Sequence, residues 1–189
     1  MQNQERIKVW DPLVRVFHWT LVVAFTLAYA TGDEVLGLHV VAGYTIAGLL
    51  LVRIVWGLVG TRYARFSNFV TAPAMVTSYL KDVIAFRARR YLGHNPAGGA
   101  MVVALLLMLL ATVVSGLLAY GVEEQAGPLV ELVAGSDGDW AKELHEFFAN
   151  GTLALVVLHV IGVIAASLQH GENLVASMWN GYKRKDGGE

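Results

Sequence analysis

The sequence of 189 residues contains no cysteine, only four prolines and few charged residues. Without cysteine the chain cannot form disulfides, thiolate iron–sulfur clusters, Cys-containing zinc sites or the C-x-x-C-H attachment of c-type haem. Charged residues make up 15% of the chain, against about a quarter in soluble domains. This deficit, with 56% hydrophobic residues and a mean hydropathy of +0.53, indicates that lipid is the solvent. Any metal or cofactor must be held by histidine, methionine, tyrosine or carboxylate side chains.

Four apolar stretches are long enough to cross a bilayer, which takes about 20 residues of helix. They cover residues 13–31, 39–57, 98–121 and 143–168. We therefore predict an all-α fold, a single integral membrane domain over residues 1–189 with four helices in a bundle. Short helices are expected on the membrane surface from residue 73 and over 172–180, and in the outer loop over 128–134. The first span also resembles a signal peptide, but its length and polar side chains favour a retained helix.

The charged residues are divided unequally between the two sides of the membrane. Thirteen of the 14 basic residues fall on the side that holds both chain ends and the 58–97 segment, and only Lys142 lies opposite. The opposite side carries nine acidic residues, Asp33 among them. The positive-inside rule therefore predicts that both termini lie in the cytoplasm. The acidic outer face suits a basic partner or a positively charged edge of a partner's cofactor.

Four of the six histidines form two pairs at matching depths. His145 and His159 lie 14 residues apart on the fourth span, on one face and about 21 Å apart along the axis. His39 begins the second span, near the depth of His145. His18 lies early in the first span, near the depth of His159. Because two imidazoles can bind one haem iron from opposite sides, each pair is predicted to hold the iron of one haem.

Two other interpretations of the histidines stay open from the residues alone. Histidines in membrane helices also form helix–helix hydrogen bonds, as in a non-redox transporter or assembly factor. Histidine pairs also bind metal ions, although these pairs lack the carboxylates that a di-metal site normally adds. Two features of the pattern favour haem: the matching depths, and the small residues on the neighbouring helices.

Two arginines are candidates for binding the anionic propionates of haem. Arg53 follows His39 by 14 residues, on the same face and at the inner depth, where a guanidinium can bind a carboxylate bidentately. The alternative for Arg53 is a side chain that extends to the inner interface. Arg15 precedes His18 by three residues and so shares its face.

The remaining histidines, His94 and His170, lie near the inner interface. His94 belongs to the loop Gly93-His94-Asn95-Pro96, and His170 follows the fourth span. Each is either a solvated loop or capping residue, or a hydrogen-bonding partner of a quinone carbonyl or a haem propionate. Quinone chemistry adds protons, which suggests a quinone site at a polar interface.

These motifs resemble the bacterial cytochrome b561 and nickel–iron hydrogenase b-type cytochrome family. The resemblance is carried by VWDPLVRVFHW at 9–19, RIVWG at 53–57, GHNP at 93–96, ENLV at 172–175 and the two histidines of the fourth span. It implies a four-helix bundle with two haem b groups, with His18, His39, His145 and His159 as the iron ligands. It also implies a multi-pass protein of the bacterial cytoplasmic (inner) membrane. Its implied role is electron transport in a respiratory chain, between a membrane quinone and a periplasmic c-type cytochrome or an oxidoreductase such as a hydrogenase.

The expected function is therefore that of a di-haem cytochrome moving electrons across the membrane. One alternative is an enzyme, a superoxide oxidase that reduces quinone with the same haems. The other is the non-redox membrane protein with structural histidines. The expected partners are membrane lipid, quinone and a periplasmic redox protein, with a homodimer also compatible with the sequence and no nucleic acid expected.

Overall fold

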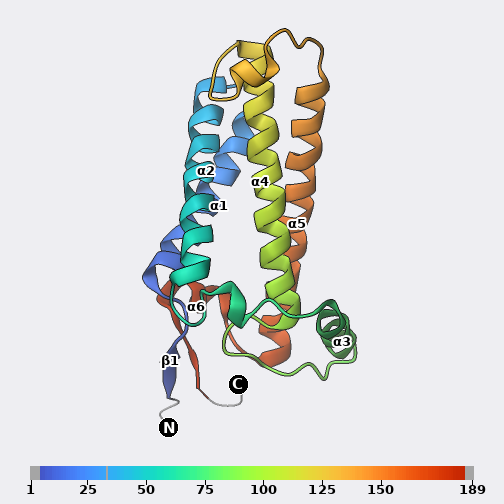
Figure 1. The fold of residues 1–189 in the computed structure, drawn as a ribbon. Helices are drawn as coiled ribbons and strands as arrows, with labels where there is room; N and C mark the ends of the chain where they lie inside the picture. Colours follow the sequence, from blue (N-terminus) through green and yellow to red (C-terminus); the bar gives the residue numbers. More distant parts are fainter. Residues whose placement is uncertain (1–4, 33, 186–189) are drawn as a thin grey trace. The chain divides into compact units, whose positions relative to one another are not determined.

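The computed structural model describes residues 5–32 and 34–185, so Asp33 and both chain ends lie outside the described residues. The described chain is mostly helical (Figure 1). Four helices are long and apolar enough to span a membrane: α1 (Pro12–Thr31), α2 (Leu36–Val59), α4 (Pro96–Glu124) and α5 (Trp140–His170). They confirm the predicted helical membrane fold. Each extends past its predicted span by at most three residues at either end, because helix geometry continues into the polar interface.

Shorter helices lie between the spans or follow the last one. They are η1 (Phe66–Asn68), α3 (Pro73–Ile84), η2 (Val130–Val133) and α6 (Leu174–Asn180). In α6, the Asn173 side chain accepts a hydrogen bond from the amide of Ala176 at 2.8 Å, which caps the helix N-terminus. Ile84, the last residue of α3, is 78% exposed, and Phe86, two residues later, is 86% exposed, as expected of apolar side chains at a membrane surface.

A small antiparallel sheet joins the two ends of the described chain. Strand β1 (Arg6–Lys8) pairs with β2 (Tyr182–Arg184), with Ile7 opposite Lys183. The carbonyl of Gly181 extends the pairing by accepting bonds from the amides of Val9 and Trp10 at 2.9 and 3.1 Å. Sequence analysis did not predict this sheet, because strands of three residues carry too little alternation to detect.

The chain forms two compact units. The terminal unit comprises Met1–Trp19, Val52–Val103 and Val157–Glu189. The central unit comprises Thr20–Leu51 and Ala104–Val156. Each of the four long helices contributes residues to both units.

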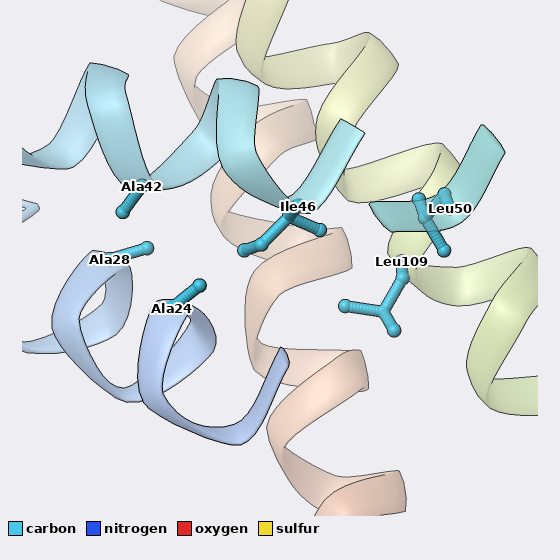
Figure 2. Close-up of a cluster of buried hydrophobic side chains, with 6 residues drawn as sticks. All are labelled: Ala24, Ala28, Ala42, Ile46, Leu50 and Leu109. Atoms are coloured by element: carbon cyan, nitrogen blue, oxygen red, sulfur yellow. The ribbon is translucent and has the colours of Figure 1, made fainter. Parts of the chain in front are cut away.

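The core of the central unit lies between α1, α2 and α4. Figure 2 shows Ala24 and Ala28 of α1 directed towards Ala42 and Ile46 of α2. Leu50 of α2 and Leu109 of α4 complete this buried cluster. Small side chains at a membrane helix interface let the two backbones approach closely, so the alanines set the α1–α2 contact.

The core of the terminal unit is organised around Asp11. One carboxylate oxygen accepts a bond from the amide of Val14 at 3.0 Å and caps α1, with Pro12 at the first helical position. The other accepts from Trp56 Nε1 at 3.1 Å and from the Thr61 hydroxyl at 2.5 Å. The Asp-Pro pair thus begins α1 and fixes it to the C-terminal end of α2.

Glu172 holds the segment after α3 against β2. Its carboxylate accepts bonds from Nε and Nη2 of Arg90 at 3.1 and 2.8 Å, and from the amide of Arg184 at 3.2 Å. Lys183 Nζ lies 3.5 Å from the same group, and the three charged side chains are at most 9% exposed. Burial alone would raise the pKa of Glu172, but the bonds from Arg90 and the charge of Lys183 outweigh it and hold the pKa below 4.5.

Replacing Glu172 with glutamine should therefore lower the free energy of unfolding by about 2 kcal/mol, because a charged acceptor is lost from a buried network. Thermal unfolding in detergent at neutral pH measures this. The control is Glu5→Gln, which breaks an exposed ion pair with Lys185 between the same chain ends and should leave the melting temperature unchanged. An equal effect of the two substitutions would contradict the assigned role of Glu172.

Candidate functional site

The central unit brings His39 of α2 next to His145 of α5. Their ring centroids are 5.8 Å apart and their planes are nearly perpendicular. His39 Nδ1 bonds to the carbonyl of Ala28 at 2.8 Å, and His145 Nδ1 bonds to the carbonyl of Thr112 at 3.0 Å. Because a carbonyl only accepts, both Nδ1 atoms carry the proton. In each ring Nε2 is therefore left with a lone pair for a metal.

The terminal unit brings His18 of α1 next to His159 of α5. Their ring centroids are 6.5 Å apart. His18 Nδ1 is buried and has no hydrogen-bond partner among the described residues. Its ring also lies edge-on to Trp19, with the centroids 5.1 Å apart. Each predicted histidine pair is thus brought together within one unit.

Arg53 is a buried cation in the terminal unit. Arg53 is 3% exposed, and its Nη1 has no hydrogen-bond partner in the described part of the chain. The guanidinium carbon lies 4.8 Å from the ring centroid of Phe66 and 6.0 Å from that of Phe69. Aromatic faces attract a cation but do not replace an anionic partner. The environment of Arg53 therefore suits an anion such as a carboxylate.

The side chain of Arg15, in α1, contacts the C-terminal end of α6. Its Nη2 donates a hydrogen bond to the carbonyl of Trp179, and its Nε is buried without a partner among the described atoms. The turn at Gly181, with φ +91°, follows directly. Sequence analysis predicted a propionate contact for Arg15, and the structure adds this backbone contact, which no local pattern indicated.

His94 packs between two aromatic rings rather than lying in a solvated loop. Its ring centroid is 4.8 Å from that of Trp10 and 4.6 Å from that of Phe69. Burial, followed by the charges of Arg53, Lys183 and His159, lowers the pKa of His94 to about 3. His94 is therefore neutral at physiological pH, and its buried Nδ1 has no partner in the described structure.

His170 lies beside the ion pairs that Glu172 forms with Arg90 and Lys183, called here the Glu172 network. Its carbonyl accepts a hydrogen bond from Arg184 Nη2 at 2.9 Å. Its ring interacts electrostatically with Arg90, Lys183 and Glu172. The structure thus places His170 next to the contacts that hold β2.

Comparison with known proteins identifies the family of this chain. The sequence profile of the prokaryotic cytochrome b561 family matches residues 9–181, which is most of the chain. The chain belongs to this family. It is accordingly a membrane b-type cytochrome that functions in electron transfer, and its cofactor is haem b.

Individual relatives of this cytochrome carry similar names. A probable Ni/Fe-hydrogenase B-type cytochrome subunit of Cupriavidus necator is 25% identical, over 93% of this chain and 86% of the relative. The probable Ni/Fe-hydrogenase 1 B-type cytochrome subunit of Escherichia coli K12 is 24% identical, over 93% and 89%. A probable Ni/Fe-hydrogenase B-type cytochrome subunit of Rhodobacter capsulatus is 24% identical, over 97% and 83%. The comparison with solved structures found no significant match.

The histidine pairs of this cytochrome fit haem iron. A metal–nitrogen bond of about 2 Å on each side, plus about 1 Å from each nitrogen to its ring centroid, separates two axial imidazole centroids by about 6 Å. The observed separations of 5.8 and 6.5 Å agree with that value. Within residues 5–32 and 34–185, no group of three or more His, Cys, Asp or Glu side chains is placed to hold a bare metal ion. Each pair thus offers the donor set of a bis-imidazole haem.

Small residues next to the pairs leave room for a planar group. Gly43 follows His39 by one helical turn, and no atom lies within 4 Å of the position that a Cβ would take there. The same holds for Gly162, three residues after His159. At both positions, space is open on the face of the helix that carries the histidine.

Gly116 of α4 makes room for the His145 ring. A Cβ at this position would lie 2.9 Å from Cε1 and 3.1 Å from Nδ1 of His145. This contact of Gly116 with a ring from α5 has no local signal in the sequence.

Replacing Gly116 with alanine should displace the His145 ring from the Thr112 carbonyl and lower haem occupancy of the central unit several-fold. Haem content per chain and the absorption spectrum of the purified protein measure this. Gly37→Ala is the control, because a Cβ at Gly37 would meet nothing within 4 Å. Full haem content in Gly116→Ala would show that haem binding does not depend on the present position of the His145 ring.

Proposed function

We propose that this cytochrome holds two haem b groups and moves electrons across the bacterial cytoplasmic membrane, between the quinone pool and a periplasmic redox partner. The observation that supports it most strongly is the pairing of four histidines from three helices into two sites. Each site lies within one compact unit, and α5 contributes one histidine to each. A protein that carries electrons across a membrane needs more than one fixed cofactor. Two histidine sites on four spanning helices meet that need.

In this proposal His39 and His145 bind one iron, and His18 and His159 bind the other. Haem supplies one-electron chemistry at its iron when it is bound. The Ala28 and Thr112 carbonyls fix the orientation of His39 and His145 through their Nδ1 hydrogen bonds.

Arg53 binds a propionate in this proposal, because its buried guanidinium lacks an anionic partner bonded to it among the described residues. His94, neutral and close to Arg53, is the residue we propose for contact with a propionate or a quinone carbonyl. Arg15 and His170 are less suited to such contacts, because each already lies among contacts with the C-terminal segment.

The relatives and the charges support the proposed partner and orientation. Several relatives are named as hydrogenase cytochrome subunits, which supports an oxidoreductase of that kind as the partner. A small c-type cytochrome would serve the same role. The excess of basic residues beside both chain ends supports a cytoplasmic location of both termini.

Reaction with quinone tests this function. Purified protein is reduced with dithionite, freed of excess reductant, and mixed with decylubiquinone or menadione in a stopped-flow spectrometer. We expect rapid loss of the reduced b-type absorption band, with one quinone consuming two electrons and two protons to form quinol. Failure of both quinones to oxidise the reduced protein would refute quinone as the membrane partner. Reduction of the oxidised protein by superoxide, followed by quinone reduction, would instead favour the superoxide oxidase.

A further inference from the structure

We infer that Thr112 of α4 and Thr152 of α5 are positioning residues for His145. Their hydrogen bond fixes how α5 lies along α4, and this places the His145 ring against the backbone carbonyl that orients it. The inference rests on the proposed function, because it takes His145 to be an iron ligand. It adds to that function the residues that hold the ligand in place.

The two threonines form a hydroxyl–hydroxyl contact in the apolar interior of the central unit. Thr112 Oγ1 and Thr152 Oγ1 lie 2.9 Å apart, and Thr152 is fully buried, with 0% exposure. The Thr112 hydroxyl donates its one proton to the carbonyl of Met108 at 2.8 Å. Thr152 is therefore the donor in the bond between the two threonines. This bond joins α4 to α5.

Thr112 also makes the contact with the ligand. Its carbonyl accepts the Nδ1 proton of His145 at 3.0 Å. Thr112 thus binds α5 twice, through its hydroxyl at Thr152 and through its carbonyl at His145. Thr152 follows His145 by seven residues, close to two helical turns, so both lie on one face of α5, about 10.5 Å apart along its axis. Two contacts at this spacing fix both the sliding and the rotation of α5 against α4.

Glycines beside these contacts allow the close approach that the hydrogen bonds need. Gly151 lies next to the α5 threonine, and a Cβ at this position would lie 2.5 Å from Cε of Met108. A Cβ at Gly116, one turn after the α4 threonine, would lie 2.9 Å from Cε1 of His145. Small residues let membrane helices approach until polar side chains can bond across the interface. The glycines therefore support the same register of α5 on α4 as the threonines.

Ser115 does not replace the threonine pair. Its hydroxyl donates to the Thr112 carbonyl at 3.0 Å, a bond within α4 that leaves the register of the two helices free. Its contact with His145 Nδ1, at 3.4 Å, is longer than that of the carbonyl. Because a helix backbone is rigid, sliding or turning of α5 would carry the His145 ring away from the Thr112 carbonyl. The bond between Thr112 and Thr152 opposes such a movement.

The position of the ring affects how strongly His145 binds iron. A bond from Nδ1–H to a carbonyl makes an imidazole a stronger donor through Nε2, which stabilises ferric iron. Loss of the threonine bond lets α5 shift and lengthens the bond from His145 to the carbonyl. The ferric state is then stabilised less, and the midpoint potential of that site rises. The His18–His159 pair belongs to the terminal unit and keeps its own contacts.

Optical redox titration of the purified holoprotein tests the inference. Thr152→Val keeps the shape of the side chain but removes the hydroxyl, and it should raise the midpoint of the His39–His145 component. We expect about a threefold shift of the ferric–ferrous equilibrium, or about 28 mV for a one-electron couple. That component is identified as the one that His159→Ala retains. The other component should not move, and Thr152→Ser, which restores the hydroxyl, should return the midpoint to the wild-type value.

Thr26→Val is the matched control. The Thr26 hydroxyl donates to the carbonyl of Val22 at 2.8 Å within α1, at an exposed position, so both midpoints should stay unchanged. If Thr152→Val does not fold, Thr112→Val removes the same bond from the other helix and should give the same rise. The double variant should shift the midpoint no further than one substitution does, because both break one bond.

Two results would overturn the inference and leave the proposed function intact. One is an unchanged midpoint of the His39–His145 component in Thr152→Val with both haems bound. The other is an equal shift of both components, because a general loosening of the bundle would then be the cause. The proposed function fails separately, if quinones do not oxidise the reduced protein. A wild-type protein without haem at the His39–His145 pair would refute both.

Discussion

Replacing His159 with alanine should halve the haem content of the purified protein, from two groups per chain to one. The substitution removes one imidazole from the pair whose ring centroids lie 6.5 Å apart, and His18 alone cannot supply both axial ligands. The His39–His145 pair belongs to the other compact unit and keeps its carbonyl contacts, so its haem should remain. The haem-to-protein ratio, measured as the pyridine haemochrome, gives the result.

His170→Ala is the matched control for that substitution. His170 lies on the same helix, and its ring lies beside charged residues of the Glu172 network. This variant should keep both haems. Two haems in His159→Ala would refute the assigned pairing. Loss of both in a protein with native helix content would show that the two sites do not load independently.

Replacing Asp11 with alanine should destabilise the protein by about 4 kcal/mol. The carboxylate accepts three hydrogen bonds in a site where the residue is 8% exposed. Each buried donor left without a partner costs about 1–3 kcal/mol, and the N-terminal cap of α1 is lost as well. Thermal unfolding in detergent, followed by circular dichroism, should show a large drop in melting temperature. Asp82→Ala is the control, because Asp82 pairs with Arg87 at an exposed site where an ion pair is worth little.

The same carboxylate should make stability depend on pH. Burial alone would raise the pKa of Asp11, but hydrogen bonds from Thr61, Val14 and Trp56 outweigh it and hold the pKa below 3.8. The folded state therefore favours the ionised form. Its stabilisation is complete well above pH 3.8 and is lost as the pH falls through the lowered pKa. Asp11→Asn should lack this component of acid sensitivity, and an acid profile like that of the wild type would contradict the assignment.

The parts of the fold that depend on lipid were predictable from the sequence. A segment that crosses a bilayer must form its backbone hydrogen bonds internally. An apolar stretch of sufficient length is therefore expected to be a helix. The spacing of His145 and His159 then fixed which histidines on other spans could meet them. The structure brings His39 and His18 to those positions.

The parts that depend on distant contacts were not predictable. The sheet between β1 and β2 joins residues from opposite ends of the sequence. The carbonyls that orient His39 and His145 belong to Ala28 and Thr112, and a backbone carbonyl has no signature in the sequence. The contact of Arg15 with Trp179 also joins distant residues, so helical spacing alone could not reveal it.

The most direct test of the central claim is low-temperature electron paramagnetic resonance of the oxidised holoprotein, combined with haem quantification. Four histidines forming two axial pairs should give two low-spin ferric signals typical of bis-imidazole haem, with two haems per chain. A high-spin signal, or one haem per chain, would contradict the claim, because one of the pairs would then not bind iron from both sides.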